Sequence, residues 1–138
     1  MKLALLQISV FTYLFIMTGC GPIRLGSSSL NDPVPSGSPT FTGTFTVGSA
    51  TGGVSIYHAG IGNYVVRLES FSVPSQSGLS LKVIGTSGTL SQALRGTTGN
   101  QNYTFITTEG SCFAQVKITS SAPADIGIAN ITSVGPCP

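Results

Sequence analysis

Hydrophobic and polar residues alternate in short runs from Thr40 to the C-terminus. The runs are rich in β-branched and aromatic residues and are bounded by Gly, Pro, Asn or Ser, which is typical of β-strands. They lie at residues 41–47, 54–57, 64–69, 79–84, 103–106, 112–118 and 126–129. Alternation gives each strand one apolar and one polar face, as in antiparallel sheets with one solvated side. The pattern therefore predicts an all-β domain, an antiparallel β-sandwich or small barrel of about 7–9 strands.

The segments between these runs carry their own local signals. Residues 89–95 fit a helical turn, because two leucines stand four positions apart. Residues 120–124 contain a proline and predict the turn between the last two strands. The glycine-rich stretches 48–53 and 96–100 lead into predicted strands and not into helices. We therefore expect them to be turns, since a phosphate-binding loop needs a helix N-terminus after it.

The first twenty residues have the layout of a secretory signal. Lys2 supplies a positive start, residues 3–17 are almost wholly apolar, and two small residues precede Cys20. This resembles a bacterial lipoprotein signal, which implies removal of residues 1–19 and a lipid on Cys20 that holds the exported protein to a membrane. Two alternatives stay open. One is a transmembrane anchor, although the apolar run is interrupted and shorter than the ~20 residues a span needs. The other is an ordinary secretory signal in which Cys20 stands by chance.

Composition divides the mature chain into two parts. Residues 20–39 are rich in Gly, Ser and Pro, which predicts a lipidated cysteine followed by a flexible linker. Residues 40–138 form the predicted β-domain. Gly21 follows the lipidated cysteine, where some lipoproteins carry an aspartate that retains them at the inner membrane. The expected location is therefore the cell envelope, with the outer membrane or cell surface as open destinations.

Charge is sparse, with 6 Lys and Arg against 4 Asp and Glu. The charges are scattered, so there is no basic stripe for nucleic acid and no polybasic patch for anionic lipid. The expected membrane contact is the lipid alone, beside a protein or small-ligand partner that the sequence does not identify.

Of the three cysteines, assigning Cys20 to lipid leaves Cys112 and Cys137 as a pair. Export places this pair in a compartment where disulfides persist, so we expect a structural disulfide. The alternatives are a redox-active pair or a buried free thiol, although catalytic dithiols are usually close in sequence.

Groups for catalysis are few. His58 is the single histidine, and the acidic residues of the predicted domain are Glu69, Glu109 and Asp125. We expect His58 on the surface, Glu69 in cross-strand charge pairing, Glu109 in a loop and Asp125 at a strand start. This set indicates no metal site, no cofactor and no catalytic residue. A weaker alternative is a minor hydrolase that uses Glu69 or His58.

Six short motifs follow one another along the predicted domain, the most specific being Gly99-Asn100-Gln101-Asn102-Tyr103. The motifs lie at residues 42–45, 52–56, 64–71, 77–83, 90–103 and 127–129. In this order they resemble the DM-thirteen domain, also named "electron transfer DM-thirteen", of Skeletor-like extracellular proteins. The resemblance implies a β-sandwich, use outside the cytoplasm and association with redox or cytochrome-like domains.

The chain departs from that family at two positions. Gly78 stands where the family has an acidic residue, and Thr119 lies near the position of the family cysteine usually invoked for a redox role. The resemblance therefore carries no electron-transfer site onto this chain. For residues 99–103 we expect a turn bonded to its own backbone, with Tyr103 entering the core; the alternative is a site for a small polar ligand. The expected function is a non-enzymatic, lipid-anchored binding module, and the alternative is an accessory redox domain.

Overall fold

The computed structural model of the protein describes residues 29–122 and 124–137, and these residues form nine strands in one sheet and no helix. The strands are β1 (Leu30–Asn31), β2 (Phe41–Gly48), β3 (Thr51–His58), β4 (Asn63–Ser72), β5 (Ser80–Gly85), β6 (Gly88–Ala93), β7 (Thr98–Ile106), β8 (Phe113–Thr119) and β9 (Asp125–Ser133). Their order in the sheet is β1-β7-β4-β3-β2-β9-β8-β5-β6.

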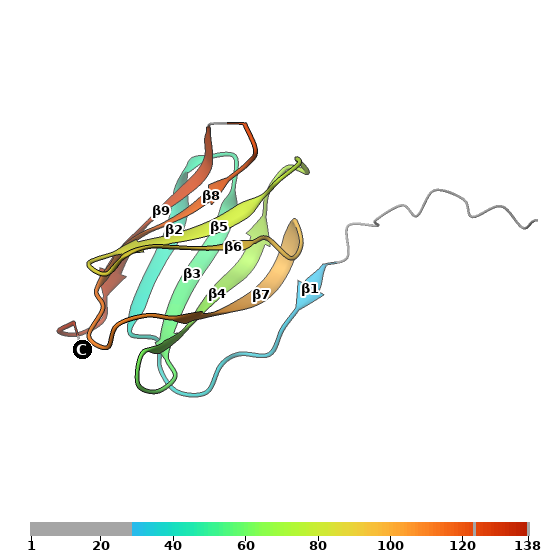
Figure 1. Ribbon diagram of the computed structural model, residues 1–138. Coiled ribbons are helices and arrows are strands. Elements are labelled where there is room, and N and C mark those ends of the chain that lie inside the picture. The colour runs from blue at the N-terminus through green and yellow to red at the C-terminus, as the bar shows by residue number, and fades with distance from the viewer. Residues whose placement is uncertain (1–28, 123, 138) are drawn as a thin grey trace, which may run out of the picture.

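The sheet is so strongly curled that it forms half of a barrel (Figure 1). Neighbouring strands are antiparallel, except that β1 runs parallel to β7. β5 and β6 curve round to face β7, and the Gln92 side chain of β6 donates a hydrogen bond to the Thr104 carbonyl of β7 (2.5 Å). The predicted all-β fold of the sandwich or barrel class is thus confirmed, in the form of a single curled sheet.

Each alternating run of the sequence lies in a strand, whereas β1 and β6 were not predicted. The expected helical turn at 89–95 is wrong, because residues 88–93 pair with β5 from Gly85↔Gly88 to Ser80↔Ala93. A single helical turn is marginal in isolation, and β5 offers a complete edge of hydrogen-bonding partners. The predicted turn between the last two strands is confirmed, since Thr119 of β8 pairs with Asp125 of β9.

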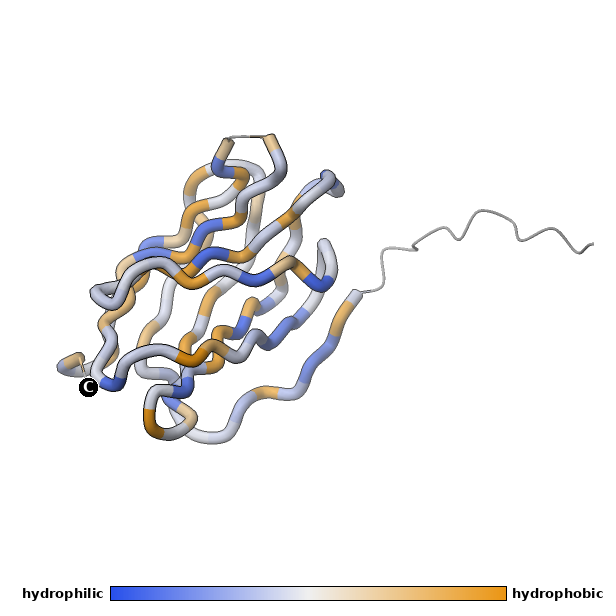
Figure 2. The backbone as a smooth tube through the Cα atoms, in the orientation of Figure 1, coloured by the Kyte–Doolittle hydropathy of each residue, from blue (hydrophilic) through white to orange (hydrophobic). Residues whose placement is uncertain are grey.

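The core lies on the concave side of the curl. On β4, Tyr64, Val66 and Leu68 are fully buried, and the same alternation shows as changing hydropathy along the strands in Figure 2. The ring of Phe113 on β8 packs edge-on against Tyr64 (4.9 Å between centroids) and against Phe41 of β2 (5.4 Å). Strands from the two halves of the sheet and its central strand therefore meet around Phe113, and burial of each such side chain contributes about 1.5–3 kcal/mol.

Cys112 and Cys137 form a disulfide with their Cα atoms 5.5 Å apart. Cys112 directly precedes β8 and Cys137 follows β9, so the bond joins the open ends of an antiparallel hairpin. The Cys112 carbonyl also accepts a hydrogen bond from the Thr86 N–H at the tip of the β5–β6 hairpin (2.9 Å). The predicted disulfide pairing is present.

Residues 32–36 belong to the connection from β1 to β2, and we call them the strap. They lie over the outer face of β7, β4 and β3 (Figure 1). Two outward-facing residues beside the strap are buried, Tyr57 (5% exposed) and Arg67 (4%). Ser55, which pairs with Arg67, is buried as well (8%). Composition predicts a flexible linker at residues 20–39, but within it β1 pairs with β7, and Asp32 and Pro33 form hydrogen bonds with β4 and β7. The reason is hydrogen bonding, because the strap is held through the carbonyl oxygens of Asp32 and Pro33 and the carboxylate of Asp32.

Candidate functional site

The five residues of the Gly-Asn-Gln-Asn-Tyr motif lie on β7 and not in a turn. Strand alternation turns Asn100 and Asn102 to the outer face and Gln101 and Tyr103 to the core. The motif therefore has two sets of hydrogen-bonding partners.

Cys20 and the signal segment 1–19 lie outside the described residues.

The outward asparagines hold the N-terminal part of the domain. Asn100 donates through its side-chain amide to Asn31 Oδ1 (2.9 Å) and accepts from the Ser70 N–H (2.9 Å). Asn102 donates through its side-chain amide to the Pro33 carbonyl (2.7 Å) and through its backbone N–H to the Asp32 carboxylate (2.8 Å). Both side chains thus act as clamps on β1 and the strap.

The two inward-pointing residues, Gln101 and Tyr103, form hydrogen bonds with the segment that connects β6 to β7. Gln101 is fully buried and donates to the Gly96 (3.0 Å) and Thr98 (3.3 Å) carbonyls, while Tyr103 donates its hydroxyl to Gln101 Oε1 (2.5 Å). The Tyr103 oxygen accepts from the Arg95 N–H (2.9 Å). Burial raises the pKa of the Tyr103 phenol, which keeps the hydroxyl protonated as a donor.

Gly99 is required by the approach of β1. Its φ is +98°, and a Cβ at this position would collide with the Leu30 carbonyl oxygen. Only glycine meets both conditions without strain. With Gly99, both asparagines, Gln101 and Tyr103 all making contacts inside the domain, the motif positions the N-terminal segment, and its polar groups are already partnered.

Two charged residues hold the strap against the sheet. Arg67 of β4 binds strap carbonyls, and Asp32 of the strap binds Arg95 and β7. Arg67 Nη1 donates to the Asp32 and Pro33 carbonyls (2.9 Å each) and to Asn102 Oδ1 (3.0 Å). The Asp32 carboxylate binds the Arg95 guanidinium. The hydrogen bond from Arg95, followed by that from the Asn102 N–H, lowers the pKa of the Asp32 carboxyl below its ordinary 3.8.

The other candidate acid–base residues lie apart. His58 Nε2 is 3.1 Å from Glu109 Oε1, and the other oxygen of Glu109 accepts from the Gly62 N–H, which ties the loop after β7 to the loop after β3. Glu69 pairs with Arg67 (Nε–Oε1 3.3 Å) and Asp125 with Lys117 (Nζ–Oδ2 2.8 Å). Over residues 29–122 and 124–137, no three His, Cys, Asp or Glu side chains gather as metal ligands. The same residues contain no helix suited to crossing a bilayer.

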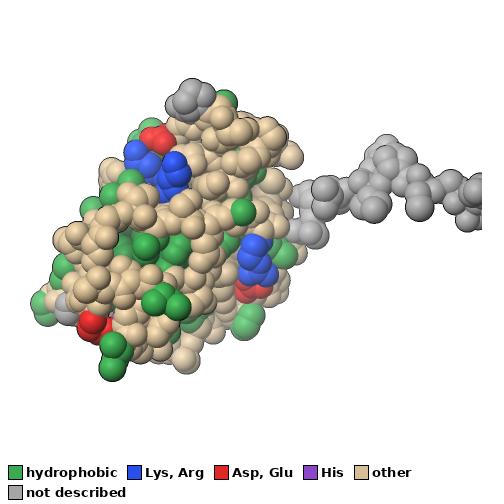
Figure 3. All heavy atoms as spheres, viewed as in Figure 1, with side chains coloured by type: hydrophobic (Ala, Val, Ile, Leu, Met, Phe, Trp, Pro, Cys, Tyr) green, Lys and Arg blue, Asp and Glu red, His purple; other side chains and the backbone are tan. Residues whose placement is uncertain are grey.

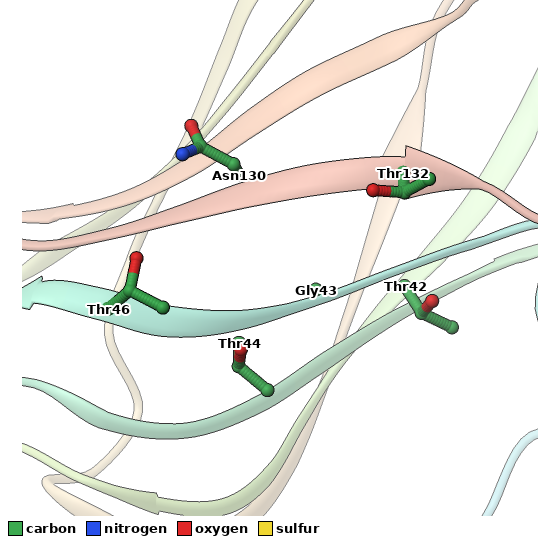
Figure 4. A pocket seen from close by; sticks show the side chains of 6 residues that line it. All are labelled: Thr42, Gly43, Thr44, Thr46, Asn130 and Thr132. Atoms are coloured by element: carbon green, nitrogen blue, oxygen red, sulfur yellow. The ribbon is translucent and has the colours of Figure 1, made fainter.

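A polar groove lies on the outer face between β2 and β9. It encloses about 410 Å³, and we call it the threonine groove (Figure 4). The residues that line it are Thr42, Gly43, Thr44, Thr46, Asn130 and Thr132. Cross-strand pairing sets Thr42 opposite Thr132 and Thr44 opposite Asn130, and a bulge follows at Thr46. Apart from Gly43, every lining residue has a side chain that carries a hydroxyl or an amide, and none of them is charged.

The hydrogen-bonding groups of this groove differ from those of the β7 motif in having free capacity. No described residue bonds the hydroxyls of Thr42, Thr44, Thr46 or Thr132, whereas Thr40, just before β2, already donates to the Ile56 carbonyl (3.1 Å). Asn130 accepts from the Gln115 side chain (3.0 Å), which leaves its own amide hydrogens for the groove. Hydroxyl and amide groups of this kind can donate to and accept from a ligand.

Sequence reasoning did not find this groove. The available signal was the spacing of Thr42, Thr44 and Thr46, which places three hydroxyls on one face of a strand. The partner residues Asn130 and Thr132 are more than 80 positions away and join them only through the pairing of β2 with β9.

Two further depressions lie elsewhere on the surface. One of about 360 Å³ runs between the strap and the strand ends at Tyr57, His58 and Thr104. The other, of about 160 Å³, lies beside Lys82 and Asp125. The first belongs to the packing of the strap, and the second is small for a ligand site.

No protein-family model, curated protein or solved structure matches the chain.

Proposed function

We propose that the protein is a lipid-anchored, non-enzymatic binding module of the cell envelope, and that the threonine groove is its contact surface. The observation that carries this proposal is the contrast in hydrogen bonding between two polar surfaces. The amides of the β7 motif have partners inside the domain, whereas four hydroxyls of the groove have none among the described residues. A groove in which several polar groups converge with free hydrogen-bonding capacity is suited to binding a ligand.

The anchor supports the same role. The lipid on Cys20 would lie nine residues before the first described residue, Ser29, and nine extended residues reach about 30 Å. The domain would be attached through β1 at the edge of β7, while β4 and β3 separate β7 from the groove strands. Four strand spacings along the sheet are about 19 Å, so the anchor and the groove are at different places on the domain.

The test has two parts. In a bacterial host, the full chain should enter the membrane fraction with a diacylated Cys20 detectable by mass spectrometry, and Cys20→Ser should release it from the membrane. A soluble form starting at Ser29 should co-sediment with isolated cell envelopes in a saturable manner. Envelope binding that rises linearly without saturation, or reproducible turnover of a substrate by the purified domain, would contradict the proposal.

The alternative of an accessory redox role rests on the family resemblance alone. Among the described residues, the Cys112–Cys137 bond is the one redox-capable group. A midpoint potential below about −300 mV would mark it as a structural bond and remove that alternative.

A further inference from the structure

We propose that the ligand of the threonine groove is a neutral, linear glycan. This inference rests on the proposed binding function and adds the chemical class of the ligand. The lining supplies four hydroxyls and one amide, and a hydroxyl both donates and accepts. Sugar hydroxyl and acetamido groups have the same dual character, so each can find a partner without the protein having to fix a donor or an acceptor in advance.

The charges next to the groove favour a neutral ligand. On β4, Glu69 is paired with Arg67, and on β8 Lys117 is paired with Asp125, while Lys82 lies one strand farther from the groove, on β5. Figure 3 shows the same distribution on one face of the molecule, where most blue side chains lie against red ones on a largely uncharged surface. A phosphate or carboxylate would lose its hydration in the groove without gaining a cation, and a cationic ligand would find no free carboxylate in the lining.

The layout of the polar groups favours an extended chain. Side chains on one face of a strand recur about every 7 Å, and neighbouring strands lie about 5 Å apart. Thr42 and Thr44 therefore form a row along β2 that Thr46 continues at the bulge, with Thr132 and Asn130 alongside on β9. On the other side, Thr44 pairs with Gly53 of β3, which has no side chain and leaves the Thr44 hydroxyl open. A linear ligand that lies along β2 meets these groups in succession.

The lining contains no aromatic ring, so we expect weak binding at each site, strengthened by many anchored copies acting on one polymer. The experiment uses the form starting at Ser29, titrated with the neutral hexasaccharides chitohexaose and cellohexaose and monitored by NMR of the backbone amides. Shifts should concentrate at residues 42–46 and 130–132. Heparin fragments and anionic phospholipid vesicles serve as charged probes and should produce no such shifts.

Three variants test the site. Thr44→Val and Thr132→Val keep the side-chain shape and remove one hydroxyl, and each should weaken binding about 2- to 10-fold. Gly53→Val keeps every groove hydroxyl but places a side chain beside Thr44; its Cβ meets ordinary contacts only, the nearest at 3.7 Å, so the fold should persist and binding should be lost. Thr89→Val on the exposed edge strand β6 is the matched control and should bind as the wild type does.

The outcomes separate this inference from the proposed function. If both hexasaccharides fail to shift the groove amides while envelope co-sedimentation stays saturable, the glycan assignment is overturned and the binding function stands. If a charged probe binds at the groove, the neutral class is wrong. Glycan binding that survives Thr44→Val, Thr132→Val and Gly53→Val, with thermal unfolding confirming that all three fold, places the ligand elsewhere and also overturns the assignment.

Discussion

Arg67 is the residue that joins the outer face of β4 to the strap and to β7. It is only 4% exposed, and its guanidinium reaches two strap carbonyls and Asn102 Oδ1, with Glu69 3.3 Å from its Nε. Removing the partners of a buried charge costs several kcal/mol, because the ion remains without water. The strap carbonyls therefore offset the cost of burying the Arg67 guanidinium, and the same hydrogen bonds hold the strap on the sheet.

Asp32 links this arrangement to pH. Its pKa is lowered in the folded state, so folding is favoured by the ionised carboxylate. That contribution is present above the unfolded pKa, near 4, and is lost as the pH falls through the folded-state value. Asp32→Asn should lower the free energy of unfolding at pH 7 by about 1 kcal/mol, because the Arg95 side of the pair is half-exposed and screened. It should also flatten the pH dependence of stability below about pH 4.

Urea unfolding measured between pH 2 and 7 checks this prediction. Asp125→Asn, which removes a carboxylate that is more exposed than Asp32 (38% against 21%) from its ion pair with Lys117, is the control and should change stability at pH 7 by less than about 0.5 kcal/mol. An Asp32→Asn variant that keeps the full acid dependence of the wild type would show that Asp32 does not couple the strap to pH.

At the scale of elements, the strap acts as a second layer over part of a one-sheet protein. Without it, the outward-facing Tyr57 would lie in solvent, as the outer face of β2 does. β1 adds only two residues to the edge of β7, so most of the attachment comes from side chains of β4 and β7.

Removal of the strap should weaken the domain without unfolding it. A form starting at Gly37 loses β1 and the hydrogen bonds of Asp32 and Pro33, and we expect its free energy of unfolding to fall by about 2–4 kcal/mol relative to a form starting at Ser29. Chemical denaturation measures the difference, and near-UV circular dichroism reports the exposure of Tyr57. Equal stability of the two forms would show that the strap contacts contribute nothing to folding.

At the scale of the whole molecule, the Cys112–Cys137 bond fixes the C-terminus to the start of β8, across a sequence separation of 25 residues. A loop of this size stabilises the folded state by about 3 kcal/mol in the chain-entropy account. The free energy of unfolding of the double variant Cys112→Ser/Cys137→Ser should therefore be lower by that amount, so that it unfolds at a lower denaturant concentration, while its far-UV spectrum remains that of a β-protein. Reduction of the wild type should give the same shift, and a reduced protein as stable as the oxidised one would contradict the prediction.

The alternation of side chains determined most of the strands, because burial of one strand face is a local requirement that any sheet imposes. The core position of Tyr103 was also predicted. The disulfide partners followed from a different argument, the assignment of Cys20 to lipid, which left Cys112 and Cys137 as a pair. The alternation missed β6, because a short, exposed edge strand carries little alternation, and β1, because two residues cannot show a period.

What the sequence by itself determined is thus the all-β class, the positions of the strands with a buried face and the pairing of the cysteines. Tertiary structure alone decided the sheet order, the docking of the strap and the candidate site. Strand pairing is non-local: β2 meets β9 across the chain, and no local pattern specifies that Thr44 will face Asn130. For the same reason, the sequence pattern did not show that the asparagines of the β7 motif bind the strap within the domain. Nor did it show that threonines of β2 and β9 line a common groove.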